Sequence, residues 1–297
     1  MKHKAWVWGL ALSLLAGAAT ADPLLGAGAM APTLERALQS QMRADRRAHP
    51  QAWQAVSSLQ GIRPGVYRAT RLQRPSVSRE LRALGPDALL PMLDALAGAG
   101  FGGALSPAER EALTVGMLEA VGVLRDPRAL PVLSAAYERA SGPTMLRAAA
   151  RGLAMSGDPA ALARVQRGAS EGELAQRATS LAALGVSPNP AVTPWLVARL
   201  AAPEPALVEA AAAALGERHS AWAATARRQN DPDRALVARS LVASFLRADP
   251  AHERALQTAV LAVGGAETLA AIDALNTGAA PRDAARLATL RRLAARQ

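Results

Sequence analysis

Cysteine, lysine and histidine carry much of the chemistry that proteins perform, and this sequence uses them sparingly. Cysteine is absent from the 297 residues, and the only lysines are Lys2 and Lys4. Thiol catalysis and cysteine-ligated metal sites are therefore excluded, and a catalytic lysine is excluded beyond residue 4. The remaining candidates for polar chemistry are histidines and carboxylates.

Beyond His3, the histidines His49, His219 and His252 lie far apart, each beside a predicted helix start. No H-E-x-x-H pattern and no histidine pair at metal-ligand spacing occurs, so we predict surface or capping positions, no metal and no cofactor. A glycine-rich run at 98–103 follows a predicted helix and lacks the Gly-Lys-Ser/Thr ending of a phosphate-binding loop. Nucleotide binding is therefore not predicted.

The glutamates also have structural explanations. Glu109 and Glu173 follow Ser106 and Ser170 at the spacing of a helix capping box. No pair of carboxylates has the arrangement that glycosidic chemistry needs. The sequence therefore predicts a protein that is not an enzyme.

The first residues have the layout of a secretory signal peptide. Lys2 and Lys4 precede an apolar stretch at 5–19, and small residues precede Asp22. We predict cleavage after Ala21 and a periplasmic or secreted protein. The alternatives are a buried N-terminal helix and an uncleaved anchor, although 15 apolar residues are short for a membrane span. Without cysteine the chain cannot be a lipoprotein, and no later apolar run is predicted to span a membrane.

The formal net charge of +10 is unevenly distributed. Residues 22–82 carry 10 arginines and four acidic residues, whereas residues 83–297 are nearly neutral. This basic segment could meet an anionic partner, namely phospholipid or lipopolysaccharide headgroups, an acidic protein or nucleic acid, of which nucleic acid is the least favoured. The favoured interpretation is a solvated face whose arginine stems cover apolar surface. The residues of the basic patch are Arg43, Arg46, Arg47, Arg68, Arg71 and Arg74.

Composition and the residue pairs that mark helix starts together predict an all-α protein. Alanine and leucine fill 73 and 42 positions, and apolar residues recur at helical spacing throughout. Asp-Pro or Asn-Pro pairs begin at Asp126, Asp158 and Asn189, where each would cap a helix that starts with proline. These starts are 32 and 31 residues apart. Two helices per repeat cannot bury their apolar faces alone, so the repeats must stack.

The run Leu-Arg-Asp-Pro-Arg-Ala-Leu-Pro-Val-Leu at 124–133 resembles short HEAT-like repeats of the phycobilisome-lyase type, and weaker copies begin at Met155 and Leu184. The resemblance covers roughly residues 76–275. It implies a right-handed α-solenoid, an α-α superhelix of HEAT-like helix pairs. We expect a signal peptide at 1–21, a basic helical cap and linker at 22–75, and the solenoid with its C-terminal capping helix at 76–297.

Such a solenoid would bind a protein or peptide along its concave face, as a non-catalytic scaffold. Trp195, Arg167 and Arg199 are the predicted contact residues; the alternative for Trp195 is that its ring fills a gap in an alanine-rich core. A second hypothesis is attachment to anionic lipid or lipopolysaccharide through the basic segment. Some HEAT-like proteins are chromophore lyases or alkylated-base glycosylases, but none of their catalytic residues can be placed here.

Overall fold

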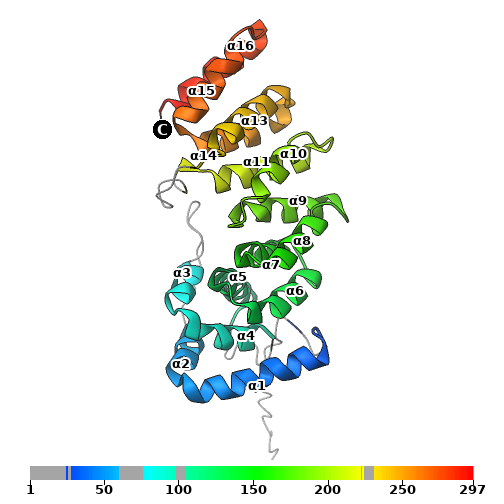
Figure 1. The fold of residues 1–297 in the computed structure, drawn as a ribbon, viewed down its shortest axis with the longest axis vertical. Helices are drawn as coiled ribbons and strands as arrows, with labels where there is room; N and C mark the ends of the chain where they lie inside the picture. The colour runs from blue at the N-terminus through cyan, green and yellow to red at the C-terminus, as the bar shows by residue number, and fades with distance from the viewer. Residues whose placement is uncertain are drawn as a thin grey trace, which may run out of the picture.

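The computed structural model describes residues 25, 28–59, 76–97, 105–221, 223 and 231–296. Every regular element in these residues is a helix, and the helices stack along one long axis (Figure 1). The predicted all-α solenoid is therefore confirmed. None of the helices in these ranges is long and apolar enough to cross a bilayer. The predicted signal peptide and the glycine-rich run at 98–103 lie outside the described residues.

Helices alternate between two layers along the solenoid. The first helices of successive pairs are α4 (Leu89–Ala97), α6 (Leu130–Glu138), α8 (Pro159–Gly168), α10 (Val192–Arg199), α13 (Arg234–Arg247) and α15 (Gly265–Asn276). The second helices are α5 (Pro107–Leu124), α7 (Pro143–Ser156), α9 (Leu174–Ala183), α11 (Pro205–Arg218), α14 (Pro250–Val263) and α16 (Pro281–Ala294). Short 3-10 turns are η2 (Pro86–Ala88), η3 (Pro127–Ala129) and η4 (Leu184–Val186).

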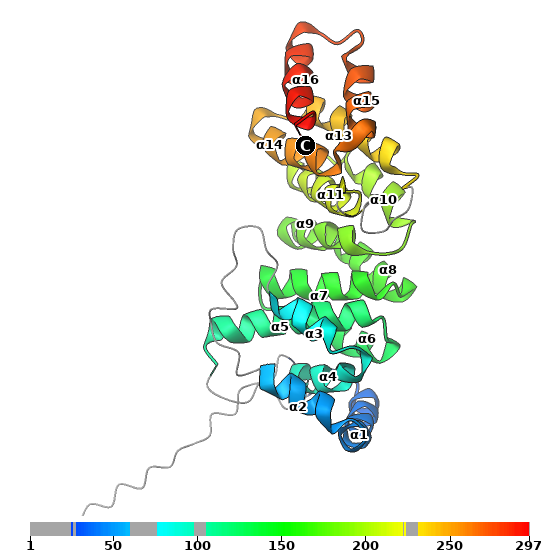
Figure 2. The ribbon, with the colours of Figure 1, turned by 90° about the vertical axis from the view of Figure 1, so that its left-hand side faces the viewer.

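Second helices pack directly on one another, and α5, α7, α9 and α11 lie in sequence along the axis (Figure 2). Small residues allow this close approach. A methyl group added to Gly152 of α7 would lie 2.7 Å from the carbonyl oxygen of Leu118 in α5. One added to Gly185 would lie 2.7 Å from the carbonyl oxygen of Ala214 in α11. The abundance of alanine and glycine therefore reflects helix-to-helix spacing as well as helix propensity.

The two ends of the solenoid are covered by flanking elements. At the start of the described chain, α1 (Pro32–Ala48) and α2 (Pro50–Leu59) pack on α4, and α3 (Ser76–Ala83) packs on α5. The Leu25 side chain is buried, and its backbone N–H donates to the carbonyl of Leu96 at 3.2 Å. At the other end α16 packs on α15.

The predicted helix caps are mostly confirmed. The Asp158 carboxylate accepts the Ala161 N–H at 2.8 Å, and Ser106 forms the predicted capping box with Glu109. The second predicted box, Ser170 with Glu173, is wrong. Helix α9 begins after Glu173, which has no side-chain cap bond, because Ser170 belongs to the turn that ends α8 and donates to the Gln166 carbonyl.

An ion triad joins three second helices. Arg151 of α7 donates to Glu119 of α5 at 3.0 Å and to both carboxylate oxygens of Glu217 in α11 at 2.9 and 3.1 Å. The side chains of Arg151 and Glu119 are only 12% and 11% exposed. Removing Glu119 would leave the charge of the largely buried Arg151 poorly compensated and should destabilise the contact between α5 and α7.

Candidate functional site

The contact residues predicted from the sequence lie on two first helices. Arg199, at the end of α10, stacks over the Trp195 ring with its guanidinium carbon 4.5 Å from the ring centroid. Arg199 also donates to the Ser170 hydroxyl at 3.1 Å, and Trp195 packs partly against the core. Arg167 is exposed near the end of α8. Their role in partner binding stays a prediction.

Half of the predicted basic patch can be placed. Arg43, Arg46 and Arg47 lie on one face of α1 around an open hollow of about 580 Å³, which we call the arginine hollow. Its other lining residues are Gln39, Met42 and Asp94. Arg68, Arg71 and Arg74 lie outside the described residues.

A separate groove opens between the α10–α11 pair and the α13–α14 pair. This inter-repeat groove has a volume of about 350 Å³. Its walls are mostly apolar or proline residues, and its rim carries charge. The walls are Leu200, Ala201, Ala202, Pro203, Pro205, Val208, Ala248 and Leu256, and the polar residues are Glu209, Ser244, Arg247, Asp249 and His252.

Two of the rim residues form a pair across neighbouring repeats. His252 of α14 lies 2.5 Å from Glu209 of α11, measured from Nδ1 to Oε1, and both side chains are about one-third exposed at 36% and 35%. Arg247, at the end of α13, donates to the Ser244 hydroxyl at 3.0 Å. The groove therefore combines an apolar floor with donors and acceptors at its edge, which is the usual composition of a ligand-binding cleft.

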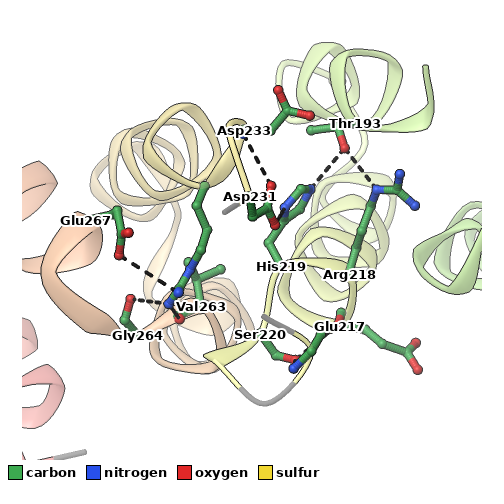
Figure 3. A network of polar contacts seen from close by, with 12 residues as sticks. Thr193, Glu217, Arg218, His219, Ser220, Asp231, Asp233, Val263, Gly264 and Glu267 are labelled. Atoms are coloured by element: carbon green, nitrogen blue, oxygen red, sulfur yellow. Dashed lines mark hydrogen bonds and ion pairs between the residues drawn. The ribbon is translucent and has the colours of Figure 1, made fainter. Parts of the chain in front are cut away.

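A buried polar network surrounds His219 at the opposite end of the same helices (Figure 3). The His219 ring lies between Asp231, 2.6 Å from Nδ1, and the Thr193 hydroxyl, 2.9 Å from Nε2. Arg218 donates from Nε to the same hydroxyl at 2.9 Å. His219 is only 2% exposed, so it is not a surface residue; it occupies the other predicted place, a helix cap, at the end of α11. It follows α11 directly and turns inward because Thr193 and Asp231 supply both hydrogen-bond partners.

The hydrogen bonds determine the protonation of this network. The Asp231 carboxylate can only accept, so Nδ1 of His219 donates to it, and in the neutral ring Nε2 then accepts the proton of the Thr193 hydroxyl, which itself accepts from Arg218. Burial lowers the pKa of His219, and this effect exceeds the opposing hydrogen bond from Asp231. The order carboxylate, imidazole, hydroxyl also occurs in nucleophilic triads, but Thr193 is fully buried and no reacting group can approach it. The network therefore ties α10, α11 and the approach to α13 together.

Arginines close to this network bind the backbone of neighbouring repeats. Arg218 donates to the carbonyls of Ser187 and Asn189, which precede α10. Arg234 donates to the carbonyls of Val263 and Gly264 where α14 ends (Figure 3). Helix ends leave carbonyl groups without intrahelical partners, and the guanidinium fork satisfies several at once.

Comparison with known proteins gives limited information. No protein-family model matches the chain, and no curated protein sequence matches it. Among solved structures, human deoxyhypusine hydroxylase in complex with glycerol is similar with a TM-score of 0.33 and 17% identity, over 84% of this chain and 99% of that chain. A likeness of this size supplies no reaction and no site residues for this protein.

One prediction from the sequence is nevertheless corrected by this comparison. We predicted a protein that is not an enzyme, whereas the similar solved structure is that of an enzyme. The reason for the error is that missing motifs exclude only the chemistries that use those motifs. Absence of catalysis is therefore no part of the function proposed below. In the described ranges no three histidine or acidic side chains come together as a metal-binding group.

Proposed function

We propose that this protein is a HEAT-like α-solenoid that captures a protein or peptide partner, and that the inter-repeat groove receives an apolar anchor residue of that partner. The groove itself is the observation that supports the proposal. When a hydrophobic side chain of the partner covers the apolar floor, the complex is stabilised by about 25 cal/mol for each Å² of apolar surface removed from water. Its charged rim provides hydrogen bonds for the backbone around the anchor.

Partner selection can be tested with a peptide library. Val208 is half-buried in the groove wall and packs against the edge of the core, and Val208→Asp should place a charge in the groove. Val123, 37% exposed at the end of α5, provides the matched control Val123→Asp. We expect native protein and the control to select peptides with a central apolar residue, and Val208→Asp to bind them about tenfold more weakly or worse.

If native protein and Val208→Asp select the same peptides with equal affinity, the groove is not the binding site. The variants Arg167→Glu and Arg199→Glu in the same selection test the contact residues predicted from the sequence. Circular dichroism of every variant should retain the helical signal of the native protein.

The proposed compartment is the periplasm or the cell exterior. The signal-peptide pattern at residues 1–21 supports this part of the proposal. Sequencing the N-terminus of protein isolated from the cell envelope or medium should find Asp22 as the first residue. A cytoplasmic protein that retains Met1 would contradict export.

A second candidate function is attachment to an anionic envelope surface through the basic N-terminal segment. The arginine hollow on α1 is the observation that favours it, because three arginines face solvent together there. Such binding should weaken steeply as salt is added, since exposed charges are screened over about 8–10 Å at physiological ionic strength.

A further inference from the structure

The arginine hollow is built on a single face of α1. The lining residues of α1 follow Gln39 by three, four, seven and eight positions, which places them on adjacent turns of one helix face. They are Met42, Arg43, Arg46 and Arg47. Met42 is buried and forms the floor, while the three arginines are exposed. Asp94 of α4 contributes the only carboxylate among the lining residues.

One of the three arginines is already held in place. Arg46 donates to Asp94 at 3.0 Å and lies over the Trp53 ring with its guanidinium carbon 4.2 Å from the centroid. Trp53 is itself fixed by a hydrogen bond of 2.9 Å to Asp45. Asp94 and Trp53 thus position a guanidinium at the edge of the hollow before any ligand arrives.

The other two arginines have no anionic partner among the residues that the structure describes. Arg47 donates from Nε to the backbone carbonyl of Arg43 at 3.3 Å, which leaves its terminal N–H groups directed elsewhere. Within the described ranges, no carboxylate lies at salt-bridge distance from Arg43 or Arg47. Three guanidinium groups and one carboxylate leave the hollow with an excess of two positive charges.

We propose that the arginine hollow binds a phosphomonoester group, with the free forks of Arg43 and Arg47 donating to its oxygens and Arg46 as a third donor. A phosphomonoester carries about −1.5 to −2 charges near neutral pH and presents three acceptor oxygens, which matches the excess charge and the donors. A phosphodiester or carboxylate carries a single charge and would leave one arginine unpaired. The inference deepens the second candidate function and rests on it for the source of the ligand.

Sedimentation with lipid vesicles tests the inference on the full mature chain. Phosphatidylcholine vesicles would contain either phosphatidic acid, a phosphomonoester, or phosphatidylglycerol, a phosphodiester, at matched surface charge. We expect preference for phosphatidic acid, reduced on the order of tenfold in the double variant Arg43→Gln, Arg47→Gln. The control Arg254→Gln, Arg282→Gln removes the same charge from exposed sites on α14 and α16 and should keep the preference.

Soluble glycerol 3-phosphate identifies the source of the group. If it displaces the protein from the vesicles, the hollow recognises the phosphomonoester itself; if the lipid preference holds without displacement, the headgroup at a membrane is the ligand. Suppose instead that the protein binds both lipids equally and that both double variants weaken this binding to the same extent. The phosphomonoester site would then be overturned, but general attachment to anionic surfaces would remain. Failure to bind either lipid would overturn both, and tighter binding of an acidic peptide than of either lipid would overturn the inference.

Discussion

At the scale of single residues, arginine explains how a basic chain forms a well-packed solenoid. The Arg218 side chain is buried and bonds two backbone carbonyls of the preceding repeat. Arg286 of α16 likewise donates to the carbonyls of Phe245 and Leu246 at the end of α13, at 2.8 and 2.9 Å. Arginine is suited to this role because it stays charged and offers five donors in a planar fork. Some of the arginines therefore stabilise the fold, whereas the arginines of α1 are those proposed to bind a ligand.

His219 should make stability depend on pH. Its folded pKa is lowered below 6.5 by burial, so the folded protein binds this proton more weakly than the unfolded chain does. The stabilisation is fully present above the unfolded pKa and is lost as pH falls through about 6.5 toward the folded value. We expect urea unfolding to show a larger loss of stability between about pH 7.5 and about pH 5.5 in native protein than in His219→Gln.

His49 provides the contrasting control. Its hydrogen bond to Asp45 raises its pKa, so its contribution is present at low pH and is lost as pH rises through the folded value. His49→Gln should therefore leave the acid-induced loss in place. If the stability of native protein and of His219→Gln depended on pH in the same way, burial in the network would not weaken proton binding by His219.

At the scale of elements, close contact between second helices depends on positions that have no side chain. The sequence places Gly185 just past the end of a helix, after Leu184, and the structure agrees, but it also buries Gly185 in η4 against α11, which no local pattern indicates. Gly152 has the same role between α5 and α7. Local patterns predict turns and caps well. A glycine that is needed because a distant helix packs against it, however, leaves no pattern in the residues around it.

Gly152→Ala should therefore destabilise the protein, by a net amount of up to about 2 kcal/mol. The added methyl group would meet the Leu118 carbonyl at 2.7 Å and the Leu133 side chain at 2.8 Å, so α5 and α7 must move apart. Overpacking of this kind costs about 1–3 kcal/mol and exceeds the gain in helix propensity of about 1 kcal/mol. Chemical denaturation would measure the difference. Gly142→Ala, where nothing lies within 4 Å of the added methyl, has no packing clash and should cost only what the N-cap of α7 loses when alanine replaces glycine, under about 1 kcal/mol. Equal effects of the two substitutions would contradict the packing argument.

At the scale of the whole molecule, each helix pair contacts mainly its neighbours, so stability should be distributed locally along the axis. Leu25 anchors one end through α4, and Arg286 anchors the other through α13. The His219 network and the inter-repeat groove occupy opposite ends of the same α10–α11 pair. A perturbation at one end of the solenoid should therefore fade before it reaches the other.

Hydrogen exchange can measure this locality. Leu25→Ala should cost about 2–5 kcal/mol at its site and speed amide exchange in α1 and α4, with α14 to α16 unchanged. Arg286→Met removes the donor to carbonyls at the end of α13, about 1–3 kcal/mol for each buried acceptor left unpaired, and should show the opposite pattern. Uniform acceleration in all helices by either variant would show that the solenoid unfolds as one cooperative unit.

The sequence by itself determined the helical class, the repeat spacing near 31 residues and most helix starts, because propensity, proline and Asp or Ser caps act within a few residues. It also singled out Arg43, Arg46 and Arg47 by charge alone. Only the tertiary structure showed that Asp94 and Trp53 hold Arg46, that His219 is buried between Thr193 and Asp231, and that the groove forms at the α10–α11 and α13–α14 junction. These features join residues up to about 50 positions apart, and such contacts arise from how the repeats stack rather than from any local pattern.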